Sequence, residues 1–234
     1  MDSKGTGLTL SIGVVLGIVG YILWQLTIGF DTKADDVATI LQNSASGATS
    51  IQIASILIVV GLVIHAAGLI STRGTAPGTS ETIGITCIVA AIVVWIASSA
   101  FGLALAEMGE KYVAASAAAA SGHAPSIAAV GGIQIAAGFT QSANVAASTL
   151  GGLLAGIGWI CMGIAYRGSD AKGFLSFVPL GWMALIQGLV LVIATLIISS
   201  LVSVDTGSQV AGIGFLLITC WSVLRGIKLV QDAS

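Results

Sequence analysis

The segment TIGITCIVAAIVVWIASSAFGLALA occupies residues 82–106, and its character decides the fold of this chain. None of its residues is charged. A helix of about 20 apolar residues is long enough to cross the ~30 Å hydrocarbon core of a bilayer. Within lipid, a single helix can satisfy its own backbone N–H and C=O groups, which an isolated strand cannot do. The segment is therefore predicted to be a transmembrane helix.

Five more segments of the chain share this apolar character, and none has Asp, Glu or Lys in its middle. They are Leu8–Phe30, Ser50–Ile70, Ala146–Tyr166, Phe174–Leu201 and Gln209–Val230. They are apolar on every side, whereas the strands of a membrane β-barrel alternate between apolar and polar residues. We predict an all-α, polytopic integral membrane protein, forming one membrane domain over residues 1–234. It has six transmembrane helices and short interfacial helices on the outer side.

The composition supports a lipid-facing surface. Charged residues make up 8% of the chain and apolar residues 56%, whereas a soluble domain has about 25% charged residues. The net charge is -2, and nucleic-acid binding needs clustered Lys and Arg, so the sequence does not indicate a nucleic-acid partner. Cys87, Cys161 and Cys220 lie in apolar segments, so they are interpreted as small apolar residues and not as disulfide or zinc ligands.

The basic residues predict the orientation. With six spans, one side of the membrane carries Lys4, Arg73, Arg167, Lys172, Arg225 and Lys228, and the other carries Lys33 and Lys111. Loops rich in Lys and Arg stay in the cytoplasm. Both termini are therefore predicted to be cytoplasmic, in a multi-pass protein of the inner or plasma membrane.

Outward from residues 82–106, the region up to Thr140 is predicted to form an outer cap, together with residues 31–49. Ala114–Ala120 is expected to be a short interfacial helix. Ser126–Thr140 is expected to be a second one or a shallow re-entrant helix, because about 15 residues are too few to cross. In the first outer loop, Asp31 is expected to cap a short helix that turns Val37, Ile40 and Leu41 toward the membrane.

Glycines mark candidate helix-packing positions. The first span carries Gly13, Gly17 and Gly20 along one face, and the fourth carries Gly152 and Gly156. Small residues let helix backbones approach closely in lipid. We expect these positions to pack within the chain, with a dimerisation face as the alternative. The two segments also resemble each other, which raises the alternative of an inverted repeat of the kind found in transporters.

His65 is the candidate cofactor-binding residue, because an ionisable group inside a membrane span is a functional candidate by default. Three interpretations remain open. The first is a neutral imidazole hydrogen-bonded to a neighbouring helix, the second is a ligand for a pigment, haem or metal, and the third is a proton-linked role. No particular cofactor is predicted.

Glu107, Glu110 and His123 are the candidate metal ligands. The two glutamates are three residues apart, so they share a face of a helix, and His123 could fold back over them. Carboxylates and an imidazole suit a divalent metal. The alternative is that these residues are simply the solvated ends of helices, with Glu107 paired to Lys111 four residues later.

Three functions are compatible with the sequence. The lack of mid-span carboxylates and the abundance of small residues favour a non-catalytic subunit or accessory protein, packed against other membrane subunits or against itself. Gln25, Gln52 and Gln187 suit hydrogen bonds between helices, or alternatively the lining of a channel or transporter for a small neutral solute. A membrane enzyme or cofactor-holding protein would use His65, or the outer site of Glu107, Glu110 and His123.

Overall fold

The computed structural model describes residues 3–169 and 171–233, and all regular structure in these ranges is helical. The elements are α1 (Ser3–Ile28), α2 (Val37–Ser46), α3 (Ala48–Ser71), α4 (Thr79–Ala120), α5 (Ala124–Arg167), α6 (Leu180–Val192), the π-helical η1 (Ile193–Ile198), α7 (Ser199–Leu201) and α8 (Val204–Asp232). Six helices are long and apolar enough to cross a membrane, with α6, η1 and α7 forming one of them. The predicted fold class is confirmed.

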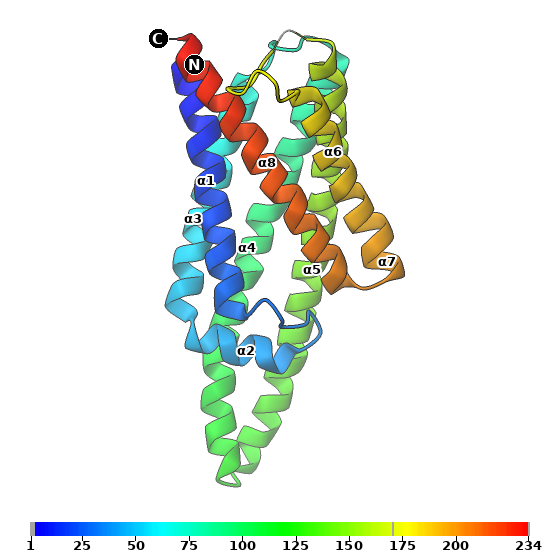
Figure 1. Cartoon of the computed structure of the whole chain (residues 1–234). Coiled ribbons are helices and arrows are strands. Elements are labelled where there is room, and N and C mark those ends of the chain that lie inside the picture. The colour runs from blue at the N-terminus through cyan, green and yellow to red at the C-terminus, as the bar shows by residue number, and fades with distance from the viewer. Residues whose placement is uncertain (1–2, 170, 234) are drawn as a thin grey trace.

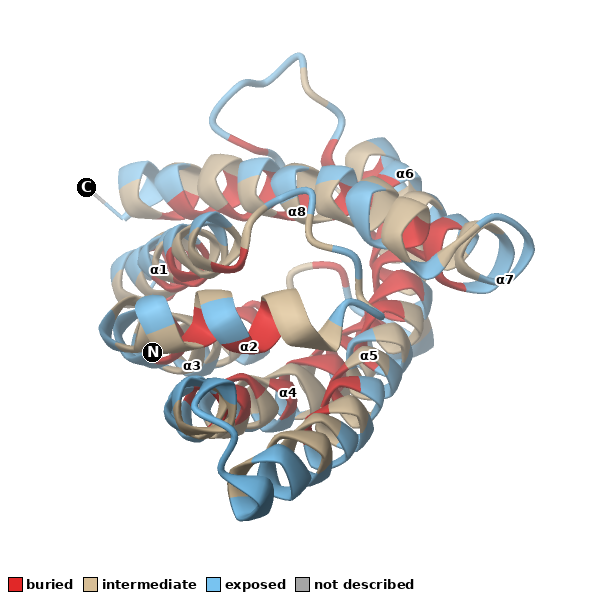
Figure 2. Cartoon of the chain, turned by 90° about the horizontal axis from the view of Figure 1, so that it is seen from below, coloured by how far each residue is buried: buried red, intermediate tan, exposed pale blue. Residues whose placement is uncertain are grey.

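The six long helices form a ring in the order α1, α3, α4, α5, α6 and α8, and α8 closes the ring by packing on α1 (Figure 2). Both termini lie at one end of this bundle (Figure 1). The opposite end carries α2, which lies across the bundle, and beyond it the tip of the α4–α5 pair. The end with the termini is called the terminal end below, and the opposite end is called the outer end. That the terminal end is cytoplasmic stays a prediction.

Glycines lie where helix backbones touch. A Cβ on Gly20 of α1 would come within 2.8 Å of the Ala54 carbonyl oxygen of α3, and Gly13 lies against the backbone at Gly61 and His65. A Cβ on Gly17, by contrast, would meet only a Leu62 side-chain carbon at 3.9 Å. The backbone of Gly17 nevertheless touches α3, because a Cβ on Gly61 would clash with the Gly17 amide nitrogen. All three glycines of the first span therefore lie where α1 and α3 meet.

The second glycine pair lies where α5 packs against α6 and η1. A Cβ on Gly156 would come within 3.0 Å of the Gly188 carbonyl oxygen, whereas one on Gly152 would meet the Thr195 side chain at 2.7 Å. On the neighbouring side of α5, a Cβ on Gly158 would meet the Gly84 carbonyl oxygen of α4 at 2.8 Å. Both glycine segments thus pack against helices of the same chain.

The outer end differs from the expectation of separate interfacial helices. α4 continues without interruption through Ala114–Ala120, and α5 begins at Ala124 and runs through Ser126–Thr140 into its span. Pro125 lies in the first turn of α5, where its missing N–H costs nothing. The alanine-rich sequence favours continued helix, so no break separates the spans from their extensions. The prediction of a second short helix or a re-entrant helix here is wrong.

α2 is a short helix at the outer end, but its cap and its contacts differ from the prediction. Its N-cap is Asp36 and not Asp31, and the Asp36 carboxylate accepts a hydrogen bond from the Thr39 amide at 3.1 Å. Ile40 and Leu41 are buried in a cluster with Leu105 of α4, so they face the protein and not the membrane.

The fifth span begins later than predicted. Pro179 is the N-cap of α6, and most of residues 173–179 form an irregular segment whose Phe174 amide donates to the Leu224 carbonyl of α8 at 2.7 Å. The Trp221 indole of α8 donates to the carbonyl of Leu180 at 3.0 Å. This contact joins the start of α6 to the middle of α8.

Candidate functional site

His65 is buried between α3 and α1. Its Nδ1 lies 3.2 Å from the carbonyl oxygen of Leu10, and its backbone lies against Gly13. An imidazole whose Nδ1 carries the proton donates a hydrogen bond to that carbonyl, which is the first of the three interpretations of this residue. Among the described residues, no three His, Cys, Asp or Glu side chains gather around a potential metal position, at His65 or elsewhere.

The structure does not bring Glu107, Glu110 and His123 together. Because α4 continues to Ala120, the turn that holds His123 lies roughly 20 Å farther along the helix axis than Glu107. The Glu107 carboxylate accepts from Lys111 Nζ at 2.7 Å, and His123 Nδ1 is 2.7 Å from the Ser126 hydroxyl. The long helix separates residues that a folded-back loop would have joined.

A polar cluster joins α4 and α5 inside the outer half of the bundle. The Ser98 hydroxyl donates to the Asn144 side-chain oxygen and lies 3.1 Å from the Ser148 hydroxyl. Asn144 and Ser148 are four residues apart on α5, so they occupy one face. The sequence analysis missed this cluster, although polar residues gather between Thr140 and Thr149 in an otherwise small and apolar region.

Glu81 is the second feature that the sequence analysis missed. It is buried in the first turn of α4 at the terminal end, and its two oxygens accept from the Gly74 amide at 2.7 Å and the Ala76 amide at 2.9 Å. The carboxylate thereby fixes the turn between α3 and α4. Its acidic position before an apolar segment is the only signal that the sequence offers.

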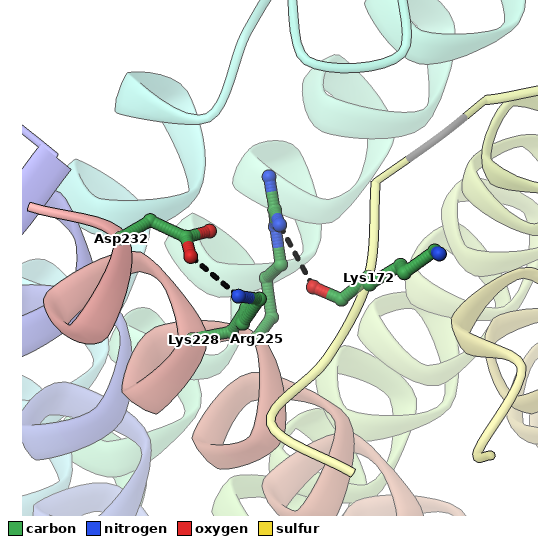
Figure 3. A network of polar contacts seen from close by, with 4 residues as sticks. All are labelled: Lys172, Arg225, Lys228 and Asp232. Atoms are coloured by element: carbon green, nitrogen blue, oxygen red, sulfur yellow. Dashed lines mark hydrogen bonds and ion pairs between the residues drawn. The ribbon is translucent and has the colours of Figure 1, made fainter. Parts of the chain in front are cut away.

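The terminal end holds a further polar network, drawn in Figure 3. Arg225 of α8 is buried and donates from Nη1 to the carbonyl oxygen of Lys172 at 2.9 Å. One turn later, Lys228 pairs with Asp232. The first contact ties the segment before α6 to α8, so it has a structural role.

The three glutamines do not share a path through the bundle. Gln25 donates to the Tyr21 hydroxyl at 2.8 Å within α1, Gln52 is exposed on α3, and Gln187 is fully buried on α6. A solute pathway needs polar groups that follow one another along an open route. These three side chains instead lie in three different environments.

The outer hairpin, residues 112–136, is the part of α4 and α5 that projects beyond α2 (Figure 1). Just below the hairpin, α2 packs closely on α4 at Gly109, where a Cβ would come within 3.0 Å of the Ala45 amide nitrogen. No Asp, Glu, Lys or Arg occurs from Tyr112 to Tyr166. The hairpin also exposes large apolar side chains, with Ile127 57% and Ile135 78% exposed.

No protein-family model, no curated protein and no solved structure matches this chain. Its function is therefore inferred from its own geometry.

Proposed function

We propose that this chain is a non-catalytic subunit or accessory protein of a larger membrane complex, and that its outer hairpin is the main contact with partner subunits. The observation that carries the proposal is the surface of the hairpin, which is exposed, apolar and free of charged residues. The proposed location is the inner or plasma membrane, with both termini in the cytoplasm.

The length of α4 supports a position of the hairpin outside the hydrocarbon layer. A helix of 42 residues is about 63 Å long, at a rise of ~1.5 Å per residue. The hydrocarbon core takes up about 30 Å of this length. From Gly109, where α2 packs, to Ala120 the helix advances a further ~17 Å.

A surface in water normally carries mixed charges, which keep a protein soluble and unassociated. The hairpin consists of two helices only, so each has one side without a neighbour in this chain. Exposed apolar patches of this kind mark protein interaction sites. The partner that fits is the uncharged outer surface of another membrane subunit, because a charged surface would lose its hydration here without gaining an ion pair.

The rest of the chain offers little for chemistry. His65 contacts a backbone carbonyl, and the described Asp, Glu, Cys and His residues form no cluster of three or more. These arrangements are typical of structural contacts between helices. They favour a subunit over an enzyme or a cofactor-holding protein.

The decisive experiment is the native mass of the protein, solubilised gently from its own membrane, with all co-migrating chains identified. The wild type is expected in one complex of fixed composition. A variant in which a short Gly/Ser linker replaces residues 115–131 keeps the Tyr112–Gln134 contact at the base of the hairpin. It should leave the complex while keeping its thermal unfolding temperature.

A point variant sharpens this test. Ile135→Lys places one charge on the exposed apolar surface and should release the partner, whereas Ile135→Val should not. A wild-type protein that is found alone in every mild detergent would contradict the proposal. So would a hairpin-deleted variant that remains in the complex.

A further inference from the structure

We propose that the groove between α3 and α4 at the terminal end binds the headgroup and upper chain of an anionic phospholipid. The groove has a volume of about 230 Å³ and is lined by Ile70, Arg73, Thr82, Ile85, Thr86 and Val89. This assignment is independent of the proposed contact at the outer hairpin.

The position of the groove suits a lipid. Ile70 belongs to the last turn of α3 and Thr82 to the first turns of α4, so the groove opens at the level where a span reaches the headgroups. From there, Ile85 and Val89 are four residues apart on α4 and continue one apolar wall toward the middle of the span.

The charge of the groove selects the headgroup. Arg73 is exposed, and its guanidinium has no ion pair or hydrogen bond with any side chain in residues 3–169 and 171–233. The carboxylate nearest in sequence, Glu81, is occupied by the amides of Gly74 and Ala76. A planar guanidinium binds a phosphate through two parallel hydrogen bonds.

Hydroxyl groups complete the upper part of the groove. Thr82 and Thr86 are exposed on α4, and the Thr82 hydroxyl is 3.4 Å from the carbonyl of Gly78, which is a long hydrogen bond. This hydroxyl is therefore free to turn toward a phosphate oxygen next to Arg73. The Thr86 hydroxyl donates to the Thr82 carbonyl at 2.8 Å and contributes shape only.

A second groove at the same end provides the control. It has a volume of about 280 Å³ and is lined by Pro179, Trp182, Met183, Ile186 and Leu217, which include no charged residue and no hydroxyl. The nearby Arg167 guanidinium lies over the Trp182 ring, 4.3 Å from its centre. This arginine already has a partner, so we expect the second groove not to distinguish between headgroups.

The test uses the full-length protein in detergent, with native mass spectrometry counting bound lipids from an equimolar mixture of phosphatidylglycerol and phosphatidylcholine. The wild type should retain one phosphatidylglycerol with about fivefold preference, the value expected for one basic residue at a membrane surface. Arg73→Gln should abolish the preference, Arg73→Lys should keep part of it, and Arg167→Gln should leave it unchanged.

Two further measurements separate a lipid site from a simple phosphate site. Val89→Trp fills the lower groove and should reduce the retention of the bound lipid. Soluble glycerol phosphate at millimolar concentration should not displace the phosphatidylglycerol. The proposal is overturned if the wild type shows no preference, if Arg73→Gln keeps it, if Arg167→Gln loses it equally, or if glycerol phosphate competes.

Discussion

The α4–α5 pair extends from the six-helix bundle into the outer hairpin, and its contacts differ between these two regions. Within the bundle, Gly84 and Gly158 let the two backbones meet, and other helices pack on either side. In the outer hairpin, a Cβ on Gly131 or Gly132 would meet nothing within 4 Å. Glycine therefore allows close helix packing in the bundle, whereas in the outer hairpin it leaves the helix surface without a side chain or a neighbour.

This difference in contacts shows that the two regions are stabilised in different ways. Helices in lipid associate through close packing and interhelical hydrogen bonds, since apolar burial supplies little driving force between them. A helical pair without further neighbours needs either a core of its own or a partner that covers its apolar side. The outer hairpin has the buried Tyr112, which accepts from Gln134 at 3.2 Å, but it exposes Ile127 and Ile135.

The largest contrast is expected from leucine substitutions at two glycines of α5. Gly158→Leu places a side chain where even a Cβ meets the Gly84 carbonyl oxygen at 2.8 Å, and overpacking of this kind costs about 3 kcal/mol. Gly132→Leu enters open space and removes the entropic cost of glycine in a helix, which stabilises by about 0.5–1 kcal/mol. The free energy of unfolding in mixed micelles measures both, and equal effects would contradict the contrast.

A smaller contrast is expected between two glutamates of α4. Glu81→Gln keeps one oxygen but turns an NH₂ group toward one of the two amides that the carboxylate now accepts from, at a cost of about 1–3 kcal/mol. Glu107→Gln removes only an exposed ion pair with Lys111, so the same unfolding measurement should change little. If Glu81→Gln is as stable as the wild type, the buried carboxylate does not hold the turn.

Next comes a contrast between two hydrogen-bonded contacts of α4 with α5. Asn144→Ala leaves the Ser98 hydroxyl with Ser148 alone inside the bundle, and such interhelical hydrogen bonds are worth roughly 0.6–1.7 kcal/mol. Gln134→Ala removes one long, partly buried hydrogen bond to Tyr112 at the base of the outer hairpin, at 3.2 Å, so its cost should be lower. Thermal unfolding should shift more for the first variant, and a larger shift for the second would reverse the interpretation.

The smallest effect concerns α2, which lies where the two regions meet. The hydroxyl and amide of Thr39 hold the pKa of the Asp36 carboxyl below its usual value. The lowered pKa means that the cap stabilises α2 above the pKa of the unfolded chain, and the effect is lost as the pH falls through the folded-state value. The protection factor of the Thr39 amide, which is the exchange rate of the unstructured chain divided by the observed rate at the same pH, should therefore fall in acid and in Asp36→Ala. Asp35→Ala is the control. Equal exchange rates of the Thr39 amide in the two variants would show that the Asp36 side chain does not stabilise the start of α2.

The sequence did not predict the hairpin because of its composition. Gln141 and Asn144 lower the hydropathy at the start of the fourth span, so the predicted span began at Ala146, although α5 is continuous from Ala124. Hydropathy locates where a chain fits lipid, but it does not show where a helix ends. The late start of α6, by contrast, agrees with the rule that proline occupies helix starts, because Pro179 is the N-cap.

The sequence alone determined that this is a six-span helical membrane protein, because apolar length and the lack of mid-span charge are local properties. It also indicated that glycines mediate packing. Only the tertiary structure decided which helices those glycines join, that Glu81 is buried on two amides, and that Glu107 and His123 lie far apart. The glycine pairings depend on contacts between residues distant in the chain, and a low-diversity sequence of Gly, Ala, Ile, Leu and Val does not specify such pairs by pattern. The Glu81 contacts depend on the conformation of the turn between α3 and α4, and the separation of Glu107 from His123 depends on where α4 ends, which hydropathy does not show.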